Sequence, residues 1–190
     1  MKKSMPNAYH FNPQPQPLYL YGTYKEDNKP NFGLFGWFSY YWDTDIGVMV
    51  CIGGKKLTRD RILATKVFSA NLVTEELLPI ADYFGNKEGY SKDKMNVDVE
   101  IEKGQVLDVP VLTKSPWIYE LEVNKTIDYD NSSVFLCKIR NVLAEDFLFD
   151  ETLSVEKLVK IVRPVHTIRQ SYFSDGSAIC SWGEAMKNLK

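Results

Sequence analysis

One short segment of the sequence combines the groups that bind a phosphate monoester. Gly53-Gly54-Lys55-Lys56-Leu57-Thr58 follows an apolar run and precedes a predicted helix. Lys55 and Lys56 supply positive charge, Thr58 supplies a hydroxyl, and the helix start supplies backbone N–H groups with a favourable dipole. The GxxxxGK[ST] spacing is absent, so the segment is not a Walker A loop. The same residues would also suit a glycine turn followed by a capped helix with solvated lysines.

A second segment, residues 31–42, is suited to a flat ring system. More than half of its residues are aromatic, and Gly33 and Gly36 interrupt them. Glycines allow a planar ligand to approach the strand backbone, whose N–H and C=O groups can then contact its polar edge. A barrel strand that packs its rings inward, and outward at a dimer interface, would have the same composition.

A third candidate, Ser69-Ala70-Asn71-Leu72, places small and polar residues in an apolar context. These residues could donate hydrogen bonds to a polyol chain or to a phosphate. The alternative is a strand end that leads to a helix cap at Thr74.

The remaining reactive side chains show no pattern typical of a catalytic or metal site. Cys51, Cys137 and Cys180 are odd in number and widely spaced, and His10 and His166 stand alone. The sequence therefore predicts no nucleophile–base pair, no metal site and no disulfide framework, and it indicates free thiols in a reducing cytosol.

Composition excludes several classes of protein. The chain has 190 residues, a formal net charge of −2 and 44% hydrophobic residues. This balance argues against binding to nucleic acid or to an anionic membrane surface. The longest apolar run, residues 46–52, is too short to span a bilayer, and the N-terminus lacks the apolar core of a signal peptide. We expect a soluble cytoplasmic protein.

Hydrophobic patterning predicts a β-rich fold. Strands are expected at residues 18–24, 31–41, 46–52, 67–72, 117–127 and 134–144. Short helices are expected after caps at Thr58, Thr74 and Ser154. Many short strands with few helices predict a mainly β (α+β) antiparallel barrel decorated by helices.

The two ends of the chain differ from the middle. Pro13 to Pro17 favours an extended geometry, so residues 1–17 are predicted to form an extended arm, or else a frayed tail, ahead of a single domain at residues 18–190. Tyr172, Phe173 and Trp182 predict that the C-terminal tail packs against another surface.

The order of these motifs resembles the flavin reductase-like FMN-binding family, and in particular its flavoredoxin branch. The resemblance runs through Pro17-Leu18-Tyr19-Leu20, Lys29-Pro30-Asn31, Trp37-Phe38-Ser39, residues 48–52, Lys56-Leu57-Thr58, residues 68–72, Asp82-Tyr83-Phe84-Gly85, Asp93-Lys94-Met95 and Ser115-Pro116. It covers about residues 14–145 well and continues loosely at Tyr172 and Trp182-Gly183-Glu184.

The resemblance implies a Greek-key split β-barrel homodimer with one FMN per subunit near the interface. By this likeness, Phe35, Gly36, Trp37, Phe38 and Ser39 contact the isoalloxazine. Cys51, Ile52, Gly53, Lys55, Lys56 and Thr58 hold the ribityl phosphate end. Ala70, Asn71 and Leu72 complete that wall, and Tyr83, Gly85, Tyr90, Lys94 and Met95 form the outer rim.

The activity implied is that of an oxidoreductase passing hydride from NAD(P)H to flavin N5 and electrons onward to an acceptor. A non-enzymatic FMN-binding carrier reduced by a redox protein is the main alternative. A structural barrel without flavin, or a relative of pyridoxine-phosphate oxidase, are others.

The sequence also departs from the family in two places. Glu88-Gly89-Tyr90-Ser91 stands where relatives often have Ser-Gly-Arg, and Asp43-Thr44-Asp45 replaces a double proline. The missing rim arginine bears on recognition of the substrate and the nicotinamide; Lys92 or Lys94 could substitute.

Overall fold

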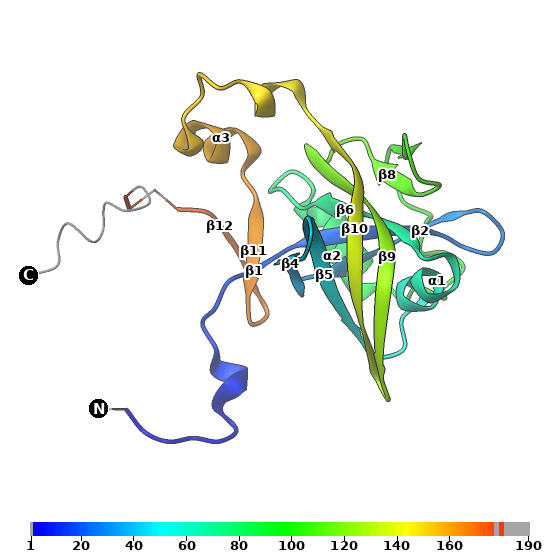
Figure 1. Ribbon diagram of the computed structural model, residues 1–190, viewed down its shortest axis with the longest axis horizontal. Helices are drawn as coiled ribbons and strands as arrows, with labels where there is room; N and C mark the ends of the chain where they lie inside the picture. The colour runs from blue at the N-terminus through cyan, green and yellow to red at the C-terminus, as the bar shows by residue number, and fades with distance from the viewer. Residues whose placement is uncertain (1, 177–178, 181–190) are drawn as a thin grey trace, which may run out of the picture.

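Two long strands form the centre of the main sheet in the computed structural model, which describes residues 2–176 and 179–180 (Figure 1). They are β9 (Trp117–Tyr129) and β10 (Ser132–Ala144), joined by a tight turn. Buried and more exposed residues alternate over much of β10, as expected for a strand with one face on the core. Both strands were predicted, and each is slightly longer than expected.

Seven antiparallel strands make up this sheet. Their order is β3 (Pro30–Phe35), β2 (Tyr19–Tyr24), β6 (Val67–Leu72), β9, β10, β5 (Ile46–Gly53) and β4 (Phe38–Trp42). The fold is therefore mainly antiparallel β with short helices, as the sequence predicted.

The sheet closes because its two edge strands are consecutive in the chain. β3 and β4 lie at opposite edges, yet Gly36 and Trp37 alone connect them. Three Cα–Cα steps span roughly 11 Å at most, so the edges must meet at this point. The prediction of one continuous strand over residues 31–41 was wrong, since the chain bends here and crosses from one edge to the other. Backbone bonds hold the bend: Phe38 N–H donates to Gly36 O and Cys51 N–H donates to Trp37 O, both at 3.1 Å.

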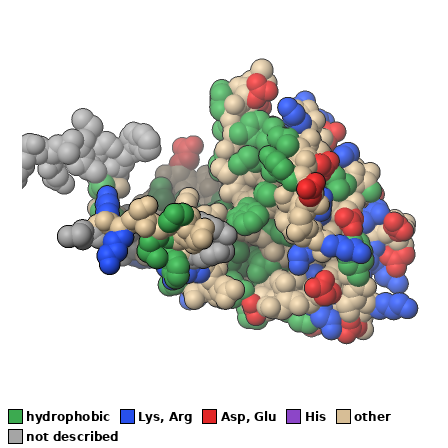
Figure 2. All heavy atoms as spheres, turned by 90° about the horizontal axis from the view of Figure 1, so that it is seen from below, with side chains coloured by type: hydrophobic (Ala, Val, Ile, Leu, Met, Phe, Trp, Pro, Cys, Tyr) green, Lys and Arg blue, Asp and Glu red, His purple; other side chains and the backbone are tan. Residues whose placement is uncertain are grey.

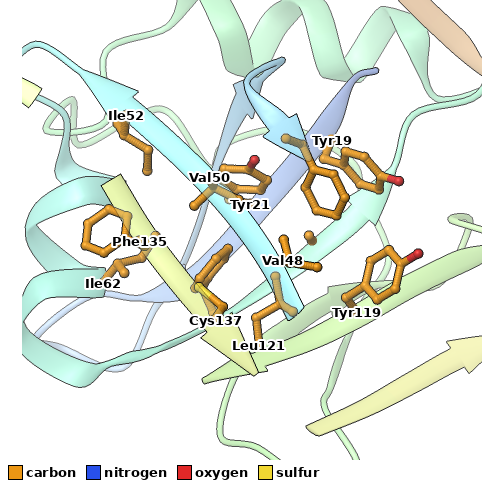
Figure 3. Close-up of a cluster of buried hydrophobic side chains, with 13 residues drawn as sticks. Tyr19, Tyr21, Val48, Val50, Ile52, Ile62, Tyr119, Leu121, Phe135 and Cys137 are labelled. Atoms are coloured by element: carbon orange, nitrogen blue, oxygen red, sulfur yellow. The ribbon is translucent and has the colours of Figure 1, made fainter. Parts of the chain in front are cut away.

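Aromatic and branched side chains fill the inside of the barrel (Figure 3). Tyr21, Phe68, Leu121 and Phe135 are fully buried there, and their side chains come from four different strands. Across the closure, the rings of Tyr19 on β2 and Phe38 on β4 stack with centroids 4.2 Å apart. This contact joins the two halves of the sheet directly.

Two helices cover the barrel. α1 (Leu57–Thr65) buries Ile62 in the barrel core, and α2 (Leu78–Asn86) packs Ala81 and Phe84 in a second cluster with residues of β2 and β3. Lys56, not Thr58, is the N-cap of α1. Leu77, not Thr74, is the N-cap of α2. Thr74 Oγ1 instead accepts the N–H of Leu77 at 3.4 Å, in the turn before the helix.

The N-terminal arm and the last described strands lie together beside the barrel (Figure 1). The arm contains a short 3₁₀ turn, η1 (Ala8–Phe11), so it is not extended throughout. It then forms β1 (Gln16–Pro17), which pairs with the hairpin β11 (Val165–Ile168) and β12 (Ser171–Ser174). Helix α3 (Val155–Val162) precedes the hairpin, and its predicted cap is confirmed: Ser154 Oγ accepts the N–H of Lys157 at 3.3 Å. Trp182, Gly183 and Glu184 lie outside the described residues.

The remaining elements are small. They are β7 (Ile101–Lys103), β8 (Pro110–Leu112) and the 3₁₀ turn η2 (Asp146–Phe149). β7 and β8 lie outside the strands that the sequence predicted. Among the described residues, no helix is long and apolar enough to cross a membrane.

A buried carboxylate organises the loop before β8. Glu120 is fully buried, and its oxygens accept backbone N–H groups of Gln105, Val106 and Leu107 at 2.5–3.0 Å. Asn141 Nδ2 donates to the same carboxylate at 2.9 Å. Burial alone would raise the pKa of Glu120, but these hydrogen bonds hold it below the ordinary value of 4.5.

We expect Glu120→Ala to lower the free energy of unfolding by about 2–4 kcal/mol, because three buried N–H groups lose their acceptor. A carboxylate with a lowered pKa stabilises the fold above its ordinary pKa, and that contribution is lost as pH falls through the folded value. Urea unfolding at pH 7 and pH 4 should therefore show a smaller loss on acidification for Glu120→Gln than for the wild type. Glu122→Gln is the control, since Glu122 is 44% exposed on the same strand. Equal behaviour of both variants would contradict this role.

Candidate functional site

A cleft of about 650 Å³ opens where the chain crosses between the two sheet edges. Its volume falls within the ~300–1,000 Å³ range of small-molecule sites. The bend between β3 and β4, the end of β5, the arm and the β11–β12 hairpin contribute its walls. The lining residues are Asn12, Gln14, Gln16, Leu34, Phe35, Gly36, Trp37, Cys51, Gly53, Lys56, Thr167 and Arg169.

One wall of this main cleft is flat and aromatic. Trp37 sits in the bend and is 60% exposed, whereas the neighbouring Phe38 is buried. Gly53 lies beside this ring: a Cβ at Gly53 would be 3.8 Å from it, an ordinary van der Waals contact. Phe35, on the other side of the bend, is held in place by stacking on Tyr21 with centroids 4.8 Å apart. Such a wall suits a planar apolar ligand.

A small cavity of about 40 Å³ adjoins the main cleft and shares Leu34, Phe35 and Lys56 with it. The start of α1, the end of α2 and residues 87–94 surround it. The other lining residues are Gly33, Leu57, Thr58, Phe84, Gly85, Lys87, Glu88, Gly89 and Lys94. The combination of glycines, cations and a hydroxyl suits a phosphate group.

Lys94 brings a buried positive charge to the small cavity. The residue is 3% exposed, and its Nζ donates to the carbonyl of Phe84 at 3.0 Å. Among the described residues, no carboxylate lies within ion-pair distance of this ammonium. Burial lowers the pKa of Lys94 to about 8; the charge of Glu88, the next largest effect, opposes this shift, and the charges of Lys25 and Lys56 add to it. An anion in the cavity would relieve that cost.

Thr58 and Asn31 form a hydrogen-bonded pair beside Lys94. Asn31 Nδ2 donates to Thr58 Oγ1 at 3.0 Å, which leaves the hydroxyl proton of Thr58 available for another acceptor. Asn31 is fully buried, and its Oδ1 has no partner among the described residues. An amide oxygen only accepts hydrogen bonds, so this buried atom requires a donor and does not itself favour a phosphate. Asn31 was not among the predicted contact residues, although its isolated amide in an aromatic stretch was a signal.

The N-terminus of α1 points additional donors at this cavity. Lys56 occupies the N-cap position, and its side chain makes no capping hydrogen bond. The first N–H groups of an uncapped helix carry a partial positive charge. Gly33 keeps the space open: a Cβ there would come within 2.9 Å of Thr58 Oγ1 and 2.8 Å of the Phe35 ring.

The structure brings about half of the predicted site residues to these two cavities. Phe35, Gly36, Trp37, Cys51, Gly53 and Lys56 line the main cleft. Thr58, Gly85 and Lys94 line the small cavity. Lys55 lies next to it, with its Nζ 5.6 Å from the ring centroid of Tyr90. Tyr90 itself borders a separate hollow with Lys25 and Lys92.

The other predicted residues lie elsewhere. Phe38, Ile52, Ala70 and Asn71 are buried in the barrel, and Asn71 uses its amide on Leu20 O, Ser69 Oγ and Leu112 N–H. Leu72, Tyr83 and Met95 are half-buried in the two core clusters. Ser39 is exposed and bonds to the neighbouring Tyr40 carbonyl. The reason is strand geometry: successive side chains point to opposite faces, so a contiguous segment cannot all face one ligand.

The arm and the hairpin supply residues that the sequence did not indicate. Asn12, Gln16, Thr167 and Arg169 close the outer side of the cleft, and Arg169 donates to the carbonyl of Phe11 at 2.8 Å. Lys56 and Arg169 are the charged residues among those described on the cleft wall. The part of the chain that the structure describes contains no cluster of three metal-binding side chains.

Comparison with known proteins gives consistent results. A family model for the flavin reductase-like domain matches residues 11–157. A search of curated proteins gave no match.

Solved structures with the same fold include two flavoredoxins. The flavoredoxin from Methanosarcina acetivorans superposes with a TM-score of 0.83 at 20% identity, covering 100% of this chain and 99% of that one. The flavoredoxin of Desulfovibrio vulgaris (Miyazaki F) gives 0.81 at 23% identity over 97% and 99%. An FMN-binding protein from Thermus thermophilus with bound p-hydroxybenzaldehyde gives 0.74 at 19% identity over 95% and 97%.

Proposed function

Because this chain belongs to the flavin reductase-like family, we propose that it is an FMN-binding oxidoreductase that accepts hydride from NAD(P)H and passes electrons to an acceptor. One observation carries the proposal: an aromatic cleft continues into a small cavity lined by a buried ammonium, a hydroxyl with a free proton and the N-terminus of a helix. FMN has the matching form, a flat ring system linked to a phosphate. When bound, it supplies hydride and one-electron chemistry, while the protein supplies position and electrostatics.

We assign the phosphate of FMN to the small cavity. Lys94, Lys56, the Thr58 hydroxyl and the first N–H groups of α1 would hold it. The observations on which this rests are the lone buried ammonium of Lys94, the free hydroxyl proton of Thr58 and the uncapped helix. Charge-assisted hydrogen bonds of this kind are stronger than neutral ones.

We assign the isoalloxazine to the main cleft, against Trp37, Phe35 and the backbone at Gly53. The described residues on the cleft wall include neither a carboxylate nor an imidazole. Hydride transfer needs reacting atoms about 3–3.5 Å apart more than it needs an acid or base. The role of the chain is then to orient two planar reactants and to exclude water between them.

An electron carrier reduced by a protein partner is the second candidate. The exposed position of Trp37 favours it, because the ring wall reaches the surface where another protein could approach. The two candidates differ in the physiological donor.

We also propose that the chain forms a homodimer. Helix α3 buries none of its residues, and Val155 and Ile161 are 76% and 53% exposed. Trp42, Ile46 and Met49 are further exposed apolar residues on β4 and β5. Hydrophobic side chains gather on part of the surface, while acidic and basic side chains mix on the part farthest from the arm (Figure 2). Exposed apolar side chains that gather on one part of a surface are typical of a protein–protein interface.

The free thiols of Cys51, Cys137 and Cys180 are compatible with a reducing compartment. We propose that the protein acts in the cytoplasm. Recovery in the soluble cytoplasmic fraction after cell breakage checks this.

The assignment of the phosphate predicts a difference between FMN and riboflavin. We expect Lys94→Met to weaken FMN binding by about 10- to 100-fold and riboflavin binding far less, because the lost hydrogen bond goes to a charged group. Lys94 binds phosphate when protonated, so wild-type FMN affinity should fall as pH rises above about 8, and the variant should lose that dependence. Fluorescence titration measures both. Lys103→Met, which lies at neither cavity, is the control; equal losses for FMN and riboflavin would contradict the assignment.

The redox role is tested by anaerobic mixing. We expect FMN-loaded protein to bleach at its visible absorbance bands on addition of NADH or NADPH. If the flavin stays oxidised with both nucleotides but is reduced rapidly by a reduced ferredoxin, the protein is an electron carrier and not a reductase. If the purified protein is colourless and saturating FMN does not raise its melting temperature, both the reductase and the electron-carrier hypotheses are wrong, because a bound ligand must stabilise the folded state.

The dimer is tested by a charge in its proposed interface. We expect Val155→Glu combined with Ile161→Glu to shift the sedimentation coefficient from dimer to monomer, because apolar contacts would be replaced by buried charges. Lys157→Glu, on the same helix and exposed, should leave the dimer intact. A wild-type chain that sediments as a monomer would refute the proposal.

A further inference from the structure

Arg169 stands alone as a cation on the outer side of the main cleft. It occupies the tip of the β11–β12 hairpin, across from the bend that holds Trp37. None of the described residues that line the cleft is acidic. The other cation there, Lys56, also lines the small cavity and belongs with the phosphate. Arg169 is therefore left facing the cleft with no counter-ion on its wall.

The hairpin tip is an unfavourable place for an arginine. The loop between β11 and β12 has two residues, and Arg169 is the first, with φ of 60°. Two-residue hairpin loops favour glycine or asparagine at such positions, since other side chains crowd the backbone. A residue that breaks the local rule is a candidate for a role of its side chain.

The guanidinium is held in position from two directions. Its Nη2 donates to the carbonyl of Phe11 at 2.8 Å, and its central carbon lies 5.3 Å from the Phe11 ring centroid. The base of the hairpin is anchored in the core, because Val165 is buried and its N–H donates to Val73 O at 3.0 Å. A guanidinium has five N–H donors and binds phosphates and carboxylates in a bidentate manner. Gln16 and Thr167, paired across β1 and β11, add neutral polar groups beside it.

We propose that Arg169 selects an anionic second substrate, one that brings a phosphate or carboxylate group into the cleft beside bound FMN. The inference rests on the proposed FMN-binding function and deepens it. The anion belongs either to the electron donor, as the pyrophosphate of a dinucleotide, or to the acceptor, as the carboxylate of an aromatic acid. Arg169 is a specificity residue, since it meets the substrate away from the reacting atoms. We assign to Arg169 the recognition role that the sequence analysis gave to Lys92 or Lys94. Lys92 borders a separate hollow, and Lys94 is buried in the small cavity.

Three variants separate recognition from structural support. Arg169→Gly removes the guanidinium and suits the positive φ, so the hairpin should fold at least as well. Arg169→Lys keeps the charge but loses the bidentate geometry. Phe11→Ala removes the ring beside the guanidinium but keeps the charge of Arg169 and the main-chain carbonyl that accepts its hydrogen bond. The FMN affinity of each variant is measured first, because Arg169 lines the cleft, and the comparisons that follow use protein saturated with FMN.

The first measurement needs no turnover. FMN-loaded protein is titrated with NAD⁺ against nicotinamide riboside and with benzoate against benzamide, following the visible spectrum of the flavin. We expect the wild type to bind the more anionic member of one pair more tightly, and that pair identifies the donor or the acceptor as the source of the anion. Arg169→Gly should weaken binding of that member about tenfold and leave unchanged the binding of its counterpart, which lacks the phosphate or carboxylate. Arg169→Lys should recover part of the loss, and Phe11→Ala should retain the preference.

A second measurement covers turnover. With Arg169→Gly, we expect KM for NADH or NADPH to rise about tenfold if the donor carries the anion, with KM for 1-benzyl-1,4-dihydronicotinamide unchanged. If the acceptor carries the anionic group, the KM for a nitrobenzoate should rise, and the KM for the methyl ester of that nitrobenzoate should stay unchanged.

Two results overturn the inference: no preference for the anionic member of either pair in the wild type, or equal losses for charged and neutral ligands in Arg169→Gly and Phe11→Ala. The latter would show that Arg169 only supports the arm. Failure of the proposed function looks different. If the chain binds no FMN, the proposed cofactor site is wrong. If the chain binds FMN and the anion but NADH and NADPH do not reduce the flavin, only the reductase role is wrong.

Discussion

The closure of the main sheet is the constraint on which the rest of this structure depends. Two residues, Gly36 and Trp37, connect one edge strand to the other, so the seven strands must curl until their edges meet. The bend exposes Trp37 between the two edge strands, β3 and β4, where the hydrogen-bonded sheet is interrupted. Stacking of Tyr19 on Phe38 holds the two edges together from inside. The main cleft is the outer surface of this junction, and its flat wall is a direct result of how the barrel closes.

Electrostatics give the site its second component. The chain carries a net charge of −2, yet the described charged residues on the main cleft wall are both cations. In the small cavity, the Lys94 ammonium is buried without a carboxylate partner, and the lowered pKa of that group measures the cost. Protein interiors tolerate such a charge when another group compensates for it. A cofactor phosphate would do so, and binding energy would then offset a cost already present in the free protein.

The chain termini turn an open groove into a walled cleft. The arm reaches the cleft through β1, and the hairpin reaches it through Arg169, which is separated from the bend by most of the chain. The arm and the hairpin hold each other through strand pairing and through the bond from Arg169 to Phe11. If the chain binds flavin as proposed, residues of the barrel would hold it and residues of the termini would face a second reactant.

The sequence by itself determined the local elements, the fold class and the two segments with the right chemistry. Strand alternation from Trp117 to Ile127, the Ser154 cap, and the lysine-bearing turn after residue 52 are all encoded over a few residues, where hydrophobic period and cap chemistry decide the outcome. Tertiary structure decided the rest. It divided the stretch 31–41 into two edge strands. It buried Ile52 and Asn71 in the barrel and left Cys51 and Gly53 in the main cleft. It also brought Asn31 to Thr58, and Arg169 to the cleft from the β11–β12 hairpin. The reason is that register, strand face and closure depend on pairing between residues far apart in the chain, and no local pattern specifies such pairing.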